Sequence, residues 1–308
     1  MKILVTGGAG FIGSHVVEAY LSQGHEVLVL DDLSSGRREN LPPGVRLIEA
    51  DVRQKTLASE LVGLGIEVVN HHAAQISVPA SVADPGHDAN INLLGLVTML
   101  QAALAWGTKR FIFISSGGAV YGEPRSLPVA EDHPMNPGSP YAVSKQAGEL
   151  YLGYFASRGL STVTLRYANV YGPRQIPQGE AGVVSVFMQA LLDQLPPTIY
   201  RYEDMPEGML RDYVFVKDCA AANLLALTAG RGAYNIGTGL ATSTMELWRA
   251  VQRAAGRLLE HDFGPARPGD LRQSALDSIK VAAELGWVPA YDLARGLAKT
   301  WAWRLTRE

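Results

Sequence analysis

A glycine-rich turn between a strand and a helix, close to the start of the chain, most restricts the possible folds. Residues 2–6, KILVT, are short and apolar, and GGAGFIG follows at 7–13. Gly7, Gly10 and Gly13 allow a tight turn, close approach to a pyrophosphate and close packing of the next helix. That helix would present free N–H groups and the positive end of its dipole. The turn therefore predicts a phosphate site at the edge of a βαβ sheet.

Short apolar segments alternate with helix-like segments over the first 170 residues or so. Strands covered by helices on both faces have this character. After residue 172 prolines become frequent, which indicates a smaller lobe. We predict an α/β fold: a Rossmann-type doubly wound parallel sheet in residues 1–172, and a mainly substrate-binding lobe in 173–308, some segments of which could return to the sheet. The predicted strands are 2–6, 26–30, 46–49, 67–71, 110–115, 162–166, 198–202 and 233–236, and the predicted helices are 11–23, 54–63, 88–106, 141–157, 180–193, 218–229, 243–255 and 290–305.

Composition narrows the classes of partner and compartment. The chain has 308 residues, a net charge of −3 and no long basic run, which argues against a nucleic-acid partner. The single cysteine, Cys219, cannot form an internal disulfide. The N-terminal apolar run is too short for a signal peptide, and no apolar stretch reaches the ~18 residues of a membrane span. We expect a cytoplasmic protein without membrane contact.

Two aspartates follow predicted strands on the same side as the glycine turn. Asp31 lies 18 residues after Gly13, where a carboxylate can bind the ribose hydroxyls of a dinucleotide and repel a 2′-phosphate. This favours NAD over NADP, although Arg37 and Arg38 nearby weaken the preference. Asp51 follows the third strand and could hold the adenine. The alternative is a glycine turn with acidic strand ends that binds no nucleotide.

The sequence YAVSK at 141–145 places a tyrosine four residues before a lysine. On a helix this spacing brings both side chains to one face. A phenol has a pKa near ~10, and a neighbouring ammonium or a cationic cofactor makes its anion accessible nearer to neutral pH. Tyr141 and Lys145 therefore form a candidate proton-transfer pair. The alternative is an exposed pair on a helix.

Together and in order, these motifs resemble the extended short-chain dehydrogenase/reductases, and within them the nucleotide-sugar epimerases of the UDP-glucose 4-epimerase type. The resemblance covers nearly the whole chain. The matching sequences are TGGAGFIG (6–13), Asp31, Asp51-Val52, HHAAQ (71–75), Asn92, SSGGAVYG (115–122), YAVSK (141–145), RYANVYGPR (166–174), RDYVFVKD (211–218) and RPGDLR (267–272).

The resemblance implies a role for each matching residue. Tyr141 would be the catalytic acid and base, and Lys145 would bind the nicotinamide ribose and lower the pKa of the tyrosine. No metal-ligand set surrounds His71 and His72, so no metal is expected. Phe11, Ile12, Val52, Ala73, Ala74, Gln75, Asn92 and Tyr167 would complete the NAD site, and Asn169, Val183, Thr198, Tyr200, Arg211, Arg267 and Asp270 would bind the UDP part of the substrate.

The implied reaction is inversion at sugar C4 of a UDP-hexose. The C4–H is not acidic, so the carbinol would be oxidised to a transient ketone and reduced on its other face, with hydride carried by NAD. Two alternatives remain open. The protein could be an epimerase or oxidoreductase for another nucleotide sugar, such as a uronate, heptose or deoxysugar. It could also be a catalytically silent NAD-binding sensor.

Three positions depart from the family pattern. A hydroxyl residue is expected at position 117, but Gly117 stands there, and Ser116 is the nearest hydroxyl. Gly118 and Ala119 occupy positions where related dehydratases and decarboxylases carry acidic residues, which argues against dehydration. Ser274 occupies a position where some relatives have a tyrosine that closes the sugar pocket. A small residue here predicts that UDP-N-acetylglucosamine and UDP-N-acetylgalactosamine are also accepted.

Relatives often form dimers through two long helices of each subunit. The corresponding segments here are about 90–106 and 142–157, and their apolar stripe is broader than one core face requires. We expect a homodimer held by a four-helix bundle. The alternative is that both helices simply pack on the sheet.

Overall fold

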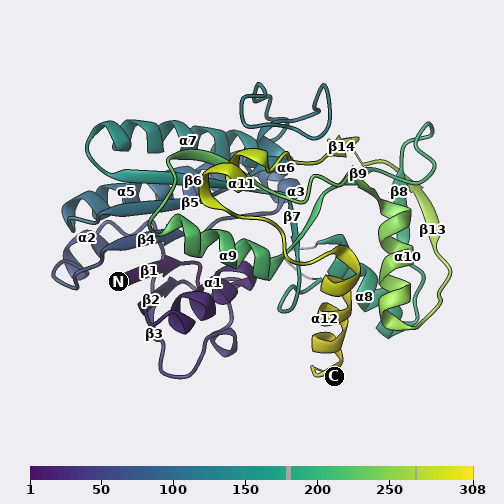
Figure 1. The fold of residues 1–308 in the computed structure, drawn as a ribbon, viewed down its shortest axis with the longest axis horizontal. Helices are drawn as coiled ribbons and strands as arrows, with labels where there is room; N and C mark the ends of the chain where they lie inside the picture. The colour runs from purple at the N-terminus through teal and green to yellow at the C-terminus, as the bar shows by residue number, and fades with distance from the viewer. Residues whose placement is uncertain (178–181, 268, 308) are drawn as a thin grey trace.

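A computed structural model describes residues 1–177, 182–267 and 269–307. Its centre is a seven-stranded parallel sheet in the order β11-β6-β5-β4-β1-β2-β3. Figure 1 labels β1 to β6 of this sheet. This confirms the predicted fold class. The strands of the sheet are β1 (Lys2–Thr6), β2 (Glu26–Asp31), β3 (Arg46–Glu49), β4 (Val68–His71), β5 (Arg110–Ser116), β6 (Ser161–Tyr167) and β11 (Gly232–Ile236).

The direction of strand order reverses next to β1, which pairs with β2 on one side and β4 on the other. In doubly wound sheets, ligands bind at such a switch point, outside the carboxyl ends of the strands. Thr6 at the end of β1 lies opposite Leu30 and His71 in the two neighbouring strands. The glycine turn follows Thr6 directly, so the topology brings it to the switch point.

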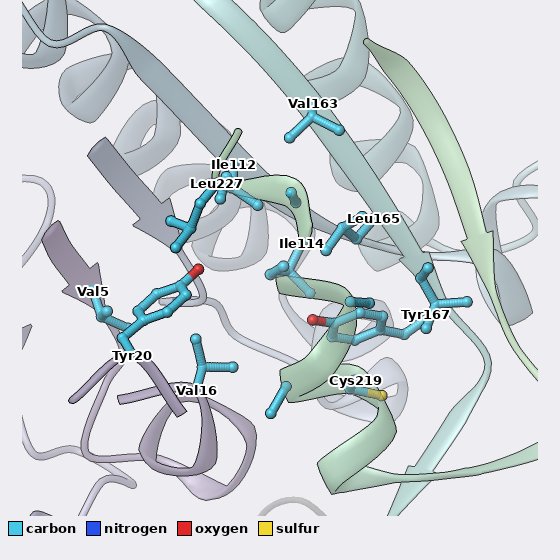
Figure 2. Packing of buried hydrophobic residues seen from close by; sticks show 14 of the residues in the cluster. Val5, Val16, Tyr20, Ile112, Ile114, Val163, Leu165, Tyr167, Cys219 and Leu227 are labelled. Carbon is cyan, nitrogen blue, oxygen red and sulfur yellow. The ribbon is translucent and has the colours of Figure 1, made fainter. Parts of the chain in front are cut away.

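Helices cover both faces of the sheet because its strands are apolar on both. One face carries α1 (Phe11–Ser22), α9 (Val216–Ala226) and α11 (Ile279–Leu285), and the other carries α2 (Leu57–Glu60), α5 (Gly95–Ala105) and α7 (Pro140–Ser157). Figure 2 shows the first core, in which Val16 and Tyr20 of α1 and Cys219 of α9 pack against strand residues.

The smaller lobe lies beside the carboxyl ends of the strands (Figure 1). Its core joins α8 (Val183–Asp193), α10 (Thr244–Ala255) and α12 (Leu293–Leu305), with Trp248 fully buried among them. The remaining strands form three small sheets: β7 (Asn169–Tyr171) with β10 (Tyr213–Phe215); β8 (Thr198–Arg201) with β13 (Asp262–Pro265); and β9 (Leu210–Arg211) with β12 (Thr242–Ser243) and β14 (Gln273–Ser274).

Several elements differ from the sequence-based expectation. The helix predicted at 54–63 is only one turn, α2. The helix predicted at 88–106 starts earlier, as α4 (Pro85–Ala89), and passes through a π-helical turn, η2 (Asn90–Leu94), before α5. The prediction lacked the short helices α3 (Val78–Ala83), α6 (Gly117–Val120) and α11, the 3₁₀ turn η1 (Arg38–Asn40), and the strands β7, β9, β10, β12, β13 and β14, which have two to four residues each.

The chain after residue 172 also contributes to the large sheet. Strand β11 pairs in parallel with β6 and forms one edge of the sheet. By length and composition alone, the helical stretch Pro85–Ala105 could cross a membrane. However, 44% of its apolar 18-residue segment is buried inside the protein. It packs against α7, as a core helix does.

Candidate active site

One cavity of about 560 Å³ gathers most of the predicted site residues at the carboxyl ends of the strands. It extends from the glycine turn to the smaller lobe. The predicted residues that line it are Gly7, Gly10, Phe11, Ile12, Gly13, Ala74, Ser116, Tyr141, Lys145, Tyr167, Asn169, Val183, Thr198, Tyr200, Arg211, Arg267 and Asp270. Asp31, Asp51, Val52, Ala73, Gln75 and Asn92 are not among its lining residues.

The glycine turn leaves no room for side chains at two of its positions. Gly7 has a φ of +65°, and a Cβ there would lie 2.6 Å from the backbone nitrogen of Ala73. A Cβ on Gly13 would lie 2.2 Å from the carbonyl oxygen of Gly7. Helix α1 begins at Phe11 with no side-chain cap on its N-terminus. The uncapped helix N-terminus and the close backbone access fit a dinucleotide pyrophosphate.

Asp31 holds this turn in place through hydrogen bonds to backbone groups. Its carboxylate accepts hydrogen bonds from the backbone N–H groups of Ala9 and Leu33, both at 2.9 Å. Burial raises the pKa of Asp31, and the two backbone bonds oppose that shift. Asp51 instead accepts 2.9 Å bonds from Nε of Arg53, and this bond keeps its pKa low. Both predicted nucleotide contacts are therefore engaged within the protein in this structure.

Tyr141 and Lys145 share one face of α7, as their spacing predicts. The helix begins at Pro140, and the Ser139 hydroxyl accepts a hydrogen bond from the N–H of Ala142 at 3.2 Å. The Lys145 Nζ lies 5.8 Å from the centre of the Tyr141 ring. Both side chains line the cavity.

Lys145 lies in a dry environment at the inner end of the cavity. Its Nζ donates to the carbonyl of Ile114 at 3.0 Å and lies 5.1 Å from the centre of the Phe113 ring. Burial lowers the pKa of Lys145 to about 8, although the carboxylates of Asp88 and Glu149 act in the opposite direction. An ammonium with a pKa in this range can change its charge near working pH.

The missing hydroxyl at position 117 has a structural explanation. A Cβ on Gly117 would lie 2.6 Å from Cδ1 of Leu276, so a leucine fills the space that a serine would need. Ser116, the last residue of β5, lines the cavity beside Tyr141. Ser116 thus offers a hydroxyl on the cavity wall, whereas the hydroxyl of the neighbouring Ser115 donates to Glu149 at 2.6 Å.

The two arginines predicted to bind diphosphate differ in their surroundings. Arg211 is largely enclosed and donates to the carbonyls of Leu210 and Leu271 at 2.8 and 2.6 Å. Burial lowers the pKa of its guanidinium. The side chain of Arg267 is 61% exposed, lies 4.7 Å from the centre of the Tyr200 ring and approaches Asp270 at 3.4 Å. Both arginines line the cavity, where their guanidinium groups could bind an anionic group.

Sequence reasoning missed several lining residues, of which His72 is the most informative. His71 packs behind the strand: its Nδ1 lies 2.8 Å from the Thr6 hydroxyl and its ring stacks on Phe113. His72, on the opposite side of the chain, lines the cavity, and burial lowers its pKa to about 3, so it is neutral. The alternation of side chains along a strand could have separated these two histidines. Among the described residues no group of histidine, cysteine or acidic side chains could hold a metal.

Comparisons with known proteins agree with this geometry. Residues 3–237 match the model of the NAD-dependent epimerase/dehydratase family. The chain is 46% identical over 309 residues to the UDP-glucose 4-epimerase of Mycolicibacterium smegmatis, covering 97% of both proteins. It resembles the crystal structure of the Thermus thermophilus UDP-glucose 4-epimerase complex with NAD, with a TM-score of 0.94, 46% identity and 99% of each chain covered.

A second solved structure is similar over the whole length. The UDP-glucose 4-epimerase of Thermotoga maritima, solved with UDP-glucose, is 42% identical with a TM-score of 0.96, and the match covers 100% of each chain. The family match includes more than half of this chain and coincides with the glycine turn, the Tyr141–Lys145 pair and the seven-stranded sheet. The chain belongs to the NAD-dependent epimerase/dehydratase family.

Proposed function

We propose that this protein is a UDP-glucose 4-epimerase that interconverts UDP-glucose and UDP-galactose with NAD as a retained cofactor. The observation that carries the proposal is the arrangement of one cavity, in which the glycine turn, Tyr141, Lys145 and Arg211 face a common space. Near-full-length identities of 42–46% to UDP-glucose 4-epimerases support it.

The roles of the two catalytic side chains follow from their positions. The Tyr141 phenolate takes the proton from the C4 hydroxyl of the sugar and returns it after the sugar has turned. The Lys145 ammonium, close to the tyrosine ring, stabilises the phenolate and holds the nicotinamide ribose. Bound NAD supplies reversible hydride acceptance. Ser116 supplies a hydroxyl on the cavity wall that hydrogen-bonds the reacting oxygen.

Substrate binding relies on the nucleotide, because the sugar has to rotate between the two hydride transfers. Arg211 and Arg267 hold the diphosphate together with Asn169, and Tyr200 faces the uracil. Asp31 stays behind the glycine turn and supports the ribose end of NAD through the Ala9 backbone. Binding energy is thus concentrated on parts of the substrate that do not move.

Proton NMR tests the proposal. Purified protein is mixed with UDP-galactose, without added NAD, and the anomeric signal of UDP-glucose is followed. Appearance of that signal supports a 4-epimerase that carries its own cofactor. No conversion, even after NAD is added, would reject the proposed substrate pair and favour another nucleotide sugar or a silent NAD-binding protein.

Dehydratase activity is the second candidate, because one relative, 36% identical over 321 residues, is a dTDP-glucose 4,6-dehydratase of an Actinoplanes strain. Eliminating water needs an additional acid and base near the ketone. We infer that Gly118 and Ala119 of the short helix α6 would be the residues closest to the ketone at these positions, and neither carries an ionisable group. Epimerisation therefore remains the better account.

We extend the substrate range to UDP-N-acetylglucosamine and UDP-N-acetylgalactosamine. Ser274 is small and buried, and its Oγ would lie 3.8 Å from a Cβ built on Gly118. A tyrosine at this position would fill space near the sugar. Ser274→Tyr is expected to suppress turnover of the acetamido substrates while sparing UDP-glucose. An equal loss for both substrate classes would remove this extension.

We also propose a homodimer in the cytoplasm. The apolar side chains of Leu150 on α7 and Leu94 before α5 are 72% and 57% exposed, and Tyr154 on α7 is 56% exposed. A partner's matching helices would bury them in a four-helix bundle. Light scattering should give twice the mass of one chain, and Leu150→Glu should give a monomer. A wild-type monomer at micromolar concentration would contradict the dimer.

A further inference from the structure

Asp88, at the end of α4, carries a carboxylate in a place where an unpaired charge is costly. Its side chain is fully buried. None of the ion pairs among the described residues includes it. A buried carboxylate without a cationic partner needs compensation from hydrogen bonds and from more distant charges. A buried charged group of this kind, close to a candidate active site, is a candidate for a functional role.

Three neutral donors satisfy this carboxylate. Oδ1 accepts from Nε2 of Gln75 and Nδ2 of Asn92, both at 2.9 Å, and Oδ2 accepts from the Ser144 hydroxyl at 2.7 Å. Gln75 and Asn92 also bond each other twice through backbone groups of Gln75, each at 2.8 Å. The π-helical turn η2 contains Asn92, and π-helical turns are frequent at functional sites.

These bonds connect separate parts of the candidate active site. Gln75 belongs to the segment after β4, next to Ala74, which lines the cavity. Ser144 lies on α7 between Tyr141 and Lys145. Asp88 therefore ties the catalytic helix to the segment behind the cofactor turn, and a shift of either part would break a hydrogen bond to a buried charge.

The charges around Lys145 single out Asp88. Glu149, on α7, also faces Lys145, but Arg166 binds its carboxylate at 2.7 Å in a buried ion pair that neutralises it. His71, the last residue of β4, and His72, which follows it, also lie near Lys145; both are neutral, because burial lowers the pKa of each to about 3. Tyr141, whose ring centre lies 5.8 Å from the Lys145 Nζ, is a further titratable neighbour. Asp88 thus supplies the negative charge in this region that no ion pair cancels.

We propose that Asp88 is a positioning residue for the reaction: its bond to Ser144 fixes the catalytic helix against the cofactor segment, and its buried charge acts on Lys145, the next residue of that helix. The proposal rests on the proposed function of Lys145. It adds a residue that touches neither substrate nor cofactor, because Asp88 does not line the cavity.

The first test compares Asp88→Asn with Ser144→Ala. The first variant removes the charge and keeps the volume, whereas the second removes one hydrogen bond and keeps the charge. In a plot of kcat/KM against pH, the decline on the alkaline side (the alkaline limb) is expected to move by ~0.5–1 pH unit to lower pH in Asp88→Asn. In Ser144→Ala it stays within the error of wild type. KM for UDP-galactose should change less than kcat in Asp88→Asn. An unshifted limb in Asp88→Asn would overturn the proposal.

The second test needs no activity. With Lys145 charged in the folded protein, losing Asp88 removes an attraction; once Lys145 is neutral, that attraction is absent in wild type as well. The Tm deficit of Asp88→Asn, meaning the wild-type Tm minus the variant Tm, should therefore shrink as pH rises from 6 to 9, through the Lys145 pKa of about 8. The deficit of Ser144→Ala should stay constant. A constant deficit in Asp88→Asn would contradict the coupling.

The two tests separate this proposal from the proposed function. Wild-type protein that converts no UDP-galactose but shows the pH-dependent deficit in Asp88→Asn would remove the epimerase proposal and keep the coupling of Asp88 to Lys145. If Asp88→Asn does not fold, the neutral and smaller Asp88→Thr, which can still bond Ser144, takes its place in both tests with the same expected and opposing results.

Discussion

The cofactor end and the substrate end of the cavity are built in different ways. At the cofactor end, backbone geometry dominates: Gly7 and Gly13 have no room for a Cβ, and Asp31 holds the turn through backbone N–H groups. At the substrate end, long side chains from short strands and loops dominate, and Arg267 is largely exposed. The difference matches the proposed reaction, because NAD stays bound while the nucleotide sugar enters and leaves.

The largest expected effect falls where the two ends meet. Lys145→Met removes the ammonium but keeps an apolar chain of similar length, and kcat should fall by ~10³-fold or more. The fold, followed by circular dichroism, should remain, whereas Tm should fall modestly below pH 8, because the variant loses the attraction between Lys145 and Asp88. Full activity of this variant would show that the Tyr141–Lys145 pair is not the proton-transfer centre.

The pH dependence of the wild-type enzyme tests the same pair. Because the pKa of Lys145 is lowered to about 8, its cation is present below that pH and lost above it. Activity that depends on the cation should therefore decline as pH rises through about 8, and should not rise there. A plot of kcat against pH that stays flat up to pH 10 would contradict this assignment.

The backbone-built end should be intolerant of a single methyl group. Gly13→Ala places a Cβ 2.2 Å from the Gly7 carbonyl oxygen, and the turn has to open to accept it. We expect ~10²-fold weaker NAD binding, measured as cofactor retained after gel filtration and by titration calorimetry. Gly153→Ala is the matched control, because nothing lies within 4 Å of its added Cβ. Equal NAD content in both variants would refute the difference between the two ends.

At the substrate end, replacing the more buried arginine should weaken substrate binding more than replacing the exposed one. Arg211→Ala removes an enclosed charge and its hydrogen bonds to the Leu210 and Leu271 carbonyls, so KM for UDP-galactose should rise ~30–100-fold. Arg267→Ala removes an exposed guanidinium, and the rise should be a few-fold at most. Isothermal titration calorimetry with UDP should show the same order of affinity loss for the two variants without any catalytic step. A larger loss in Arg267→Ala would reverse the comparison.

The smallest expected effect concerns the replaced hydroxyl. Gly117→Ser should cost ~1–3 kcal/mol of unfolding free energy, because the new side chain meets Leu276. In the double variant with Leu276→Ala, the loss of unfolding free energy should be smaller than the sum of the two single losses, by ~1 kcal/mol or more. Urea unfolding measures all four proteins. Strict additivity would mean that Leu276 does not explain the glycine.

The sequence was sufficient for features that depend on local pattern. The strands of the large sheet, the glycine turn and the shared face of Tyr141 and Lys145 follow from apolar runs, glycine spacing and helical periodicity, and the structure has them at or near the predicted residues. Helix α2 is shorter than predicted because only one turn at Leu57–Glu60 packs on the sheet core.

Features that depend on distant contacts could not be predicted in this way. Leu276 fills the space beside Gly117, β6 rather than another strand is the partner of β11, and Asp88 bonds Ser144 across two helices. Each contact joins residues far apart in the sequence, and no local periodicity records it. The inward orientation of the Asp31 carboxylate depends likewise on the loop that follows β2.

The most direct test of the central proposal follows the hydrogen at sugar C4. UDP-galactose deuterated at C4 is converted by the purified protein in ordinary water without added NAD, and the product is examined by NMR and mass spectrometry. Internal hydride transfer by a retained cofactor predicts UDP-glucose that keeps the deuterium at C4. Loss of deuterium to water, or its appearance in free NADH, would contradict the proposed mechanism.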